Sequence, residues 1–145
     1  MIGLIQRVSE ARVEVENEVI ASIRTGLLAL IAVHRDDENR DIHRLAERLL
    51  SYRVFPDSDG RMNRSVSDID GGLLLVPQFT LTADTRKGTR ASFTKGAVPE
   101  VASEYFEQLV TACRKSLQSV ETGRFGADMR VSLVNEGPVT FWLES

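Results

Sequence analysis

Apolar and polar residues alternate along the first quarter of the chain. The alternation is clearest in residues 11–15 and 19–23, which the turn-like Glu16-Asn17-Glu18 separates, and it is imperfect in residues 2–8. A period of two is typical of strands that bury one face, so these segments are predicted to be successive antiparallel strands. Residues 26–33 (GLLALIAV) are apolar throughout and favour an interior strand that is covered on both faces.

Two later segments repeat their apolar residues at the three- and four-residue spacing of an amphipathic helix. The first covers residues 39–52, with Asp36 or Asp37 available as its N-cap. The second covers residues 99–118 and begins with a proline, which is tolerated in the first turn of a helix. Its apolar face includes Cys113, which we interpret as a small core residue, because burial in apolar surroundings raises the pKa of a thiol and makes it unreactive.

A short apolar run changes abruptly into a polar sequence within residues 71–82 (GGLLLVPQFTLT). Residues 73–76 are predicted to form a strand buried on both faces, because the run is too short for a helix. Pro77 lacks a backbone N–H and interrupts sheet pairing, so the amides of the next three residues are predicted to be unpaired. Two interpretations are open here. Either the proline marks a sheet edge or bulge with Gln78 as a satisfied polar residue, or the strand end is a place for chemistry.

The remaining elements complete an α+β pattern. Residues 53–55 are predicted to be a short strand and residues 56–60 (PDSDG) a turn, because the basic residues that follow do not fit a calcium-binding loop. Residues 130–134 and 139–143 are predicted to be two strands joined by Asn135-Glu136-Gly137-Pro138. The order strands, helix, strands, helix, strands indicates an α+β fold with a mostly antiparallel sheet and two main helices, in one domain that spans the whole chain.

Composition and charge narrow the classes of function. The 145 residues are 42% hydrophobic, which is enough for one packed core, and the single cysteine excludes an internal disulfide. No apolar run reaches the roughly 20 residues of a membrane span, and the chain starts without a charged leader, so we expect a cytoplasmic protein with no membrane role. The net charge of −3 gives no general attraction to nucleic acid.

One loop, residues 83–96, differs locally from this charge balance. It holds four cations and one acid: Arg86, Lys87, Arg90 and Lys95 against Asp84. Glycines and small polar residues between the cations indicate irregular backbone. The loop is either a contact for phosphate groups or an ordinary solvated surface loop, and the pattern alone allows both interpretations.

The usual catalytic motifs are absent. The two histidines, His34 and His43, have no paired cysteines or metal-ligand spacing near them, so neither a metal site nor a cofactor is predicted. No GxSxG or SxxK motif supports a side-chain nucleophile, and no Walker loop or GxGxxG motif supports nucleotide chemistry. Two polar segments with proline remain, residues 77–80 and 135–140. Backbone amides held at a strand break can stabilise a developing oxyanion, so a hydrolase could work there without a general base of its own.

Five short motifs follow one another along the whole chain. They are Gln6-Arg7-Val8, Pro77-Gln78-Phe79-Thr80-Leu81, Asp84-Thr85-Arg86-Lys87-Gly88, Gly123-Arg124-Phe125-Gly126-Ala127-Asp128-Met129 and Asn135-Glu136-Gly137-Pro138-Val139-Thr140. Together they resemble the D-aminoacyl-tRNA deacylase family. The resemblance implies a barrel-like sheet and a cytoplasmic homodimer. It also implies hydrolysis of the ester between a D-amino acid, or glycine, and the 3′-terminal adenosine of tRNA, which keeps mischarged tRNA out of translation.

The resemblance also implies roles for individual residues. Three would form the catalytic floor of the pocket: Gln78, Phe79 and Thr80. Gly137 and Pro138, joined by a cis peptide bond, would enter the pocket from the other subunit and reject L-amino acids sterically. Arg7 would help to orient this Gly-Pro pair.

Two looser correspondences concern the tRNA itself. Three residues would lie near the terminal adenosine: Phe125, Gly126 and Met129. Arg86 and Lys87 of the basic loop would meet tRNA phosphates. The partners implied by the resemblance are therefore aminoacyl-tRNA and a second copy of the chain.

Pro77 departs from the family pattern, which usually has serine at this position. A hydroxyl there cannot be essential if this protein is active. Thr80 is retained, yet a threonine hydroxyl needs a base in order to act as a nucleophile, and the sequence identifies none beside it. We therefore favour a mechanism in which backbone donors do most of the work and the ribose 2′-hydroxyl of the substrate assists the attack of water.

Two other functions are consistent with the same residues. A non-enzymatic RNA-binding dimer would use the basic loop, and its binding would depend strongly on salt without any ester cleavage. An esterase of small acyl substrates would cleave free amino-acid esters as fast as charged tRNA. Rates of ester cleavage, measured on aminoacyl-tRNA and on free amino-acid esters, distinguish these alternatives from a deacylase.

Overall fold

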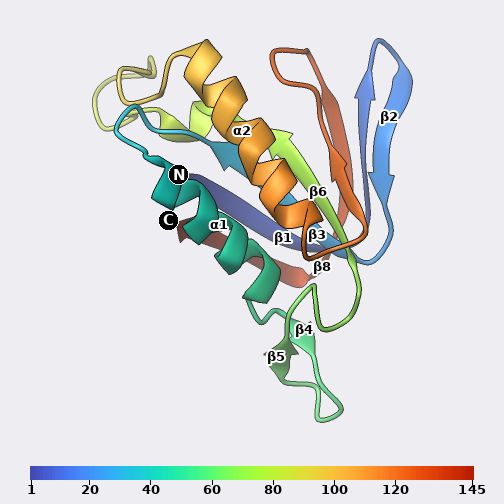
Figure 1. Cartoon of the computed structure of the whole chain (residues 1–145). Coiled ribbons are helices and arrows are strands. Elements are labelled where there is room, and N and C mark those ends of the chain that lie inside the picture. The colour runs from blue at the N-terminus through green and yellow to red at the C-terminus, as the bar shows by residue number, and fades with distance from the viewer.

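A strongly curved six-stranded sheet forms the centre of the computed structural model, which describes residues 1–145 (Figure 1). Its strands are β1 (Ile2–Val15), β2 (Glu18–Ile23), β3 (Gly26–Ala32), β6 (Gly72–Pro77), β7 (Val120–Thr122) and β8 (Arg130–Glu144). They lie in the order β2-β1-β3-β6-β7, and β8 pairs with β1 as well. β1 is antiparallel to β2, β3 and β8, whereas β6 is parallel to both β3 and β7. The predicted α+β class with a mostly antiparallel, barrel-like sheet is confirmed, although the two parallel pairings were not predicted.

Two strands are longer than the apolar pattern indicated. Residues 2–8 and 11–15, predicted as separate strands, are the two halves of β1. No glycine or proline lies between them to form a turn, and after Val8 the strand exchanges its neighbour β3 for β2. The two strands predicted near the C-terminus are likewise the halves of β8, because both halves pair with β1 on either side of an interruption.

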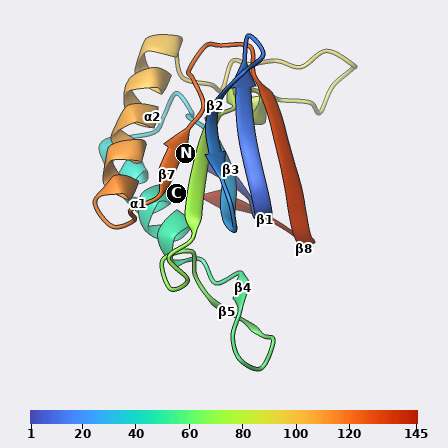
Figure 2. The ribbon, with the colours of Figure 1, turned by 90° about the vertical axis from the view of Figure 1, so that its right-hand side faces the viewer.

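Two helices, α1 (Asn39–Ser51) and α2 (Pro99–Arg114), cover the same face of the sheet, as Figure 2 shows from the side. The core between helices and sheet includes Leu45, Leu73 and Leu109, and a second core inside the curve of the sheet includes Val13 and Leu74. Neighbouring residues of β6 alternate between the two cores, so this strand is buried on both faces, as predicted. Neither helix combines the length and the apolar composition that crossing a membrane requires.

The N-cap of α1 is Glu38, and not Asp36 or Asp37 as predicted. The side chains of Glu38 and Asp41 form the reciprocal hydrogen bonds of a capping box with each other's backbone N–H. The bond from the Glu38 amide is the main reason why the pKa of the Asp41 carboxyl lies below its ordinary value. Asp37 is not free to cap the helix, because its carboxylate lies 2.6 Å from the amino group of Met1.

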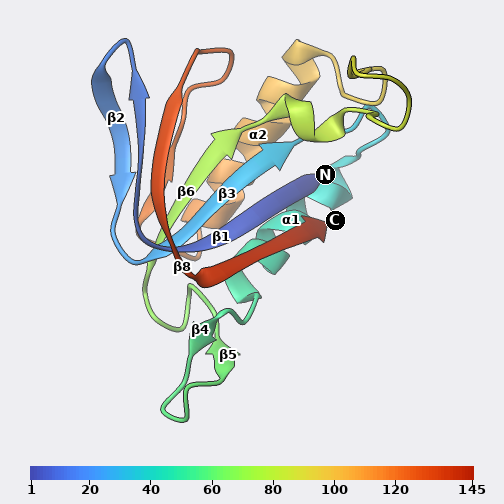
Figure 3. The same ribbon diagram turned by 180° about the vertical axis from the view of Figure 1, so that it is seen from behind.

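Some element ends also differ from the prediction. α2 ends at Arg114, earlier than residue 118. The strand predicted at residues 53–55 begins two residues later as β4 (Phe55–Pro56), which pairs with β5 (Met62–Arg64) in a hairpin that projects from the body of the protein (Figure 3). The predicted turn lies between these two strands. The Asp57 carboxylate closes it by accepting hydrogen bonds from the backbone N–H groups of Asp59 and Arg61.

Candidate active site

The backbone leaves the sheet directly after Pro77. Pro77 is still paired with Ile31 of β3, and the Gln78 amide donates a hydrogen bond of 2.7 Å to the Ile31 carbonyl. A short 3₁₀ helix, η1 (Phe79–Thr82), follows at once. The predicted end of sheet pairing is therefore confirmed, but it begins one residue later than expected, because the Gln78 amide is bonded and not free.

The amides of Phe79 and Thr80 are unpaired. They are the first two N–H groups of η1, which have no acceptor within a helix, and no carbonyl elsewhere in the chain accepts from them. Both residues are exposed, so this pair of donors lies at the surface of the protein. Two adjacent backbone donors at fixed positions are suited to bind an oxyanion.

The side chains around these amides are tied to one another. The Gln78 amide nitrogen donates a hydrogen bond to the Thr80 hydroxyl oxygen, and no carboxylate or imidazole contacts that hydroxyl. The buried Thr82 hydroxyl donates a hydrogen bond of 2.8 Å to the Phe79 carbonyl, which fixes the turn of η1. The Phe79 ring is 63% exposed and packs at a tilt against Phe93, with 5.1 Å between the ring centroids.

A cleft of about 480 Å³ opens beside this floor. It is lined by the end of β6 and the residues after it, by the start of α2, and by the loop that contains Phe125, Gly126 and Met129. The parallel pairing of β7 with β6 places that loop here, because the Gly123 amide continues the ladder with a bond to the Leu75 carbonyl. The structure thus brings together two sets that lie far apart in the sequence: Gln78 and Phe79 with Phe125, Gly126 and Met129.

The Gly137-Pro138 pair lies in an interruption of β8, and its peptide bond is cis. Gln6 of β1 faces Thr140 and Val8 faces Asn135, so the four residues 136–139 bulge out opposite Arg7 alone. The Arg7 guanidinium donates to the Glu136 carbonyl at 3.1 Å and to the Val54 carbonyl at 2.6 Å. Arg7 therefore holds the bulge against the segment that leads into β4.

The floor and the bulge lie far apart in one chain. Gln78 sits at the Ala32 end of β3, beside the beginning of β1, whereas the bulge is five residues along β1 and three strands across the sheet. With about 3.3 Å per residue and about 4.8 Å per strand, the separation is on the order of 20 Å. Figure 3 shows η1 and the bend of β8 at opposite ends of the sheet. A single chain does not bring these two predicted sets of residues together.

The basic loop is held by its own acid. Asp84 and Ser92 exchange two backbone hydrogen bonds across the loop neck. The Asp84 carboxylate also binds the Arg86 guanidinium and lies 3.5 Å from the Lys95 ammonium. Hydrogen bonds from Arg86 hold the pKa of Asp84 well below its ordinary value, and the same contact raises the pKa of Arg86. Lys87, which has no ion pair within the chain, is the freer of the two predicted phosphate contacts.

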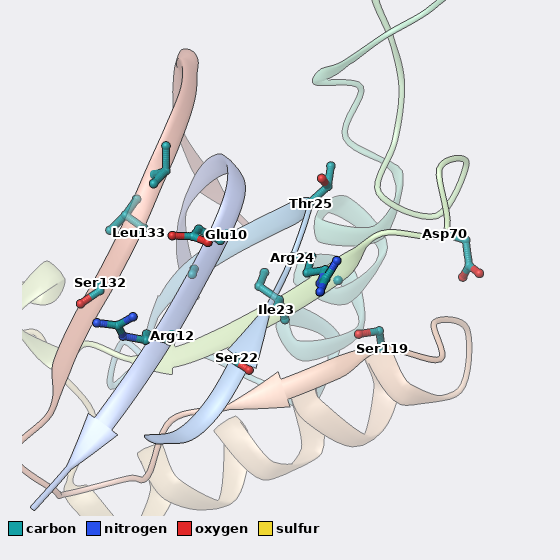
Figure 4. Close-up of a pocket in the computed structure, with 13 residues that line it drawn as sticks. Glu10, Arg12, Ser22, Ile23, Arg24, Thr25, Asp70, Ser119, Ser132 and Leu133 are labelled. Atoms are coloured by element: carbon teal, nitrogen blue, oxygen red, sulfur yellow. The ribbon is translucent and has the colours of Figure 1, made fainter. Parts of the chain in front are cut away.

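A larger hollow lies elsewhere, at the Gly72 end of β6 (Figure 4). Its volume is about 780 Å³, and its polar lining includes Arg12 and Asp70. Figure 4 shows these two side chains on different sides of the hollow, without a common point toward which they converge. No residue of the predicted site lies in it, and the cleft beside Gln78 remains the candidate site.

Sequence reasoning missed two parts of the arrangement around the site. It assigned no role to the side chains of Asn135 and Thr140, which are bonded to each other at 3.0 Å across the bulge. It also did not connect Phe93 with the floor, although this ring packs on the exposed Phe79. The first could have been suspected from the motif of residues 135–140, whereas the second depends on a long-range contact that no local pattern indicates.

Comparison with solved structures first defines the class of protein. The chain superimposes with a TM-score of 0.96 on a structure titled c-Myc DNA Unwinding Element Binding Protein, at 33% identity and with 100% of this chain and 99% of that chain covered. A second structure, titled as a probable eukaryotic D-amino acid tRNA deacylase, gives a TM-score of 0.85 over 99% of this chain and 98% of that chain. At 15% identity, this second likeness establishes the fold alone. The chain is thus an α+β protein with the deacylase fold.

Comparison with known sequences then identifies the family. The family model described as D-Tyr-tRNA(Tyr) deacylase matches residues 4–144. Relatives named D-aminoacyl-tRNA deacylase include one from Alkalilimnicola ehrlichii, 63% identical over 145 residues, with 100% of this chain and 97% of the relative covered. Another, from Vibrio cholerae, is 54% identical over 145 residues, with both chains fully covered. The chain belongs to the D-Tyr-tRNA(Tyr) deacylase family, a family of enzymes, and the resemblance drawn from its motifs is confirmed.

Proposed function

We propose that this protein hydrolyses the ester bond between a D-amino acid and the 3′-terminal adenosine of tRNA. The relatives named D-aminoacyl-tRNA deacylase match the chain from end to end, which supports this activity. The observation that carries the chemistry is the pair of unpaired amides of Phe79 and Thr80 beside a cleft. Two such donors can hold the oxygen of a tetrahedral intermediate without help from a charged side chain.

The reaction needs only water as a second reactant. Water attacks the ester carbonyl carbon, the carbonyl oxygen becomes an oxyanion between the two amides, and the bond from carbon to the ribose 3′-oxygen then breaks. The 3′-oxygen takes up a proton, so the products are free tRNA and a free D-amino acid. The ribose 2′-hydroxyl assists the attacking water, because the Thr80 hydroxyl has the Gln78 side chain as its partner and no base beside it.

Discrimination against L-amino acids is assigned to Gly137 and Pro138 of a second copy of the chain. The separation of floor and bulge, on the order of 20 Å in one chain, supports a homodimer in which each bulge enters the other subunit's cleft. A screen that excludes an L side chain leaves room for hydrogen, so achiral glycyl-tRNA is proposed as a second substrate. Arg7 orients the bulge through its bond to the Glu136 carbonyl.

The remaining contacts concern the tRNA. The loop with Phe125, Gly126 and Met129 lines the same cleft as the floor, which supports its proposed role at the terminal adenosine. Lys87 and Arg86 of the basic loop are proposed to meet phosphates, with Arg86 shared between phosphate and Asp84. The protein would act in the cytoplasm and remove mischarged tRNA before translation uses it.

The test compares two stereoisomers of one substrate. Purified protein is incubated with D-Tyr-tRNA and with L-Tyr-tRNA, and release of the amino acid is followed over time. Rapid cleavage of the D ester alone is expected, and equal rates or no cleavage of the D ester would contradict the proposal. Salt-dependent binding of tRNA without cleavage would instead indicate an RNA-binding protein. Equally fast cleavage of free amino-acid esters would indicate a general esterase.

A further inference from the structure

The base of the β8 bulge is closed by side chains. The Asn135 Oδ1 atom accepts a hydrogen bond of 3.0 Å from the backbone N–H of Val139, and its Nδ2 atom donates one of 3.0 Å to the Thr140 hydroxyl oxygen. The Gln6 side-chain amide, on the neighbouring strand, donates to the same hydroxyl oxygen at 3.3 Å. Asn135 therefore joins the two residues at which β8 leaves and rejoins its pairing with β1.

These bonds replace the ladder that the bulge lacks. None of residues 136–139 has a partner on β1, because the register passes from Val8 facing Asn135 directly to Gln6 facing Thr140. A segment without ladder bonds takes its shape from whatever side chains hold it. On one side Arg7 binds the Glu136 carbonyl, and on the other side Asn135 binds the Val139 amide. Gly137 and Pro138 lie between these two attachments and are exposed.

We propose that Asn135 is a positioning residue which, through Val139 and Thr140, sets how far the Gly137-Pro138 tip projects and so determines the discrimination between D and L substrates. This inference rests on the proposed function, in which the tip enters the cleft of a second subunit. Asn135 does not contact the substrate. It affects specificity by holding the tip in one position. A more mobile tip could move aside for an L side chain, which the fixed tip excludes.

The size of the effect follows from the number of bonds. Asn135→Ala removes both, and the loss of two hydrogen bonds changes the population of a bound conformation by about tenfold to a hundredfold. The rate on L-Tyr-tRNA relative to D-Tyr-tRNA is therefore expected to rise by about that factor. The rate on the D ester itself should fall little, since the floor is formed by the end of β6 and by η1, to which the Asn135 side chain makes no bond.

Three further variants separate positioning from folding. Asn135→Asp keeps an acceptor for the Val139 amide and offers its second oxygen to the Thr140 hydroxyl as donor, so it is expected to restore most of the discrimination. Thr140→Val removes one of the two Asn135 bonds, together with the longer bond from Gln6, with almost no change of shape; because the bond to the Val139 amide stays, it should give a smaller loss. Asn63→Ala is the matched control, because the Asn63 side chain also ties a turn, with a bond of 2.8 Å to Asp57 in the projecting hairpin.

A readout that needs no activity accompanies the kinetics. Hydrogen exchange of the Val139 amide, measured by NMR on the full chain, should become faster in Asn135→Ala and stay slow in Asn135→Asp and Asn63→Ala. If Asn135→Ala does not fold, Thr140→Val decides the matter. An unchanged ratio of L to D rates in folded Asn135→Ala and Thr140→Val, including an equal fall of both rates, would overturn the proposal. Failure of the unaltered protein to cleave D-Tyr-tRNA would reject the proposed function, while the exchange data would still test the Asn135 contact alone.

Discussion

Two interruptions of the sheet contain proline, and they are held in different ways. The floor after Pro77 is fixed by backbone, since β6 has a parallel neighbour on each side and the Gln78 amide is bonded to β3. The bulge around Pro138 has no ladder partner, and side chains of Arg7 and Asn135 fix it. This difference predicts where substitutions matter. The floor, whose chemistry relies on backbone amides, should tolerate side-chain changes, whereas the tip of the bulge, which side chains hold, should not.

The largest effect is expected where β3 and β6, the two strands that lead to the floor, approach each other closely at their first paired residues. Gly26 of β3 and Gly72 of β6 are paired, and a Cβ atom added at Gly26 would lie 1.9 Å from the Gly72 carbonyl oxygen. Gly26→Ala must push the strands apart, so the free energy of unfolding should fall by about 3 kcal/mol or more. Urea denaturation followed by circular dichroism measures this change.

The control for this substitution is Gly60→Ala in the projecting hairpin. No atom lies within 4 Å of the added Cβ there, but φ is +77°, so a loss of about 1 kcal/mol is expected from backbone conformation alone. Similar denaturation midpoints for the two variants would show that the close approach of β3 and β6 does not limit stability.

The bulge should respond in specificity rather than in folding. Gly137 has φ of +128°, and an added Cβ would lie 2.7 Å from a Val139 methyl carbon and 3.0 Å from the Arg7 guanidinium. Gly137→Ala must therefore move the tip, and the ratio of D to L deacylation is expected to fall by about tenfold or more. Single-turnover rates on both esters measure it. A ratio equal to that of the unaltered protein would show that the tip takes no part in the screen.

Features that depend on local sequence could be predicted, whereas features that depend on contacts between distant residues could not. The apolar periods located both helices, the break at Pro77 and the strands other than the short β5 and β7, because these follow from local burial and from a missing backbone donor. The parallel pairings of β6 could not be predicted, since they depend on chain crossovers and not on local pattern. The Asp37 cap was wrong because the amino group of Met1, distant in sequence, occupies that carboxylate. Elimination of other catalytic motifs, and not periodicity, singled out the bulge, and the motif resemblance gave roles to the bulge and to the loop at Phe125.

The floor should tolerate loss of a hydroxyl. Thr80→Val removes the acceptor of the Gln78 bond but leaves the backbone amide in place, so kcat on D-Tyr-tRNA is expected to stay within about threefold. Thr82→Val is the matched comparison, because its buried hydroxyl donates to the Phe79 carbonyl and fixes the turn. A larger loss is expected there, about tenfold. Complete inactivity of a folded Thr80→Val protein would favour a side-chain nucleophile. The floor would then depend on a side chain, as the bulge does.

The smallest effect concerns the basic loop, which a side chain holds as Asn135 holds the bulge. Asp84 binds Arg86, and Asp84→Asn should free that guanidinium for phosphate, so the slope of log affinity for tRNA against log salt should steepen by about one. Asp59→Asn, an equal charge change in the projecting hairpin, should leave the slope unaltered.

The titration of Asp84 tests the same contact without tRNA. The pKa of this carboxyl is depressed, first of all by the hydrogen bonds from Arg86. A depressed pKa stabilises the loop above the ordinary value of 3.8 and ceases to do so as pH falls through the folded-state pKa, so the contact persists at neutral pH. In Arg86→Ala the pKa, followed by carbon NMR of the carboxyl, should return toward 3.8. A carboxyl that titrates normally in the unaltered protein would mean that Arg86 is as free as Lys87 to meet phosphate, and the loop would then not be held by its own acid.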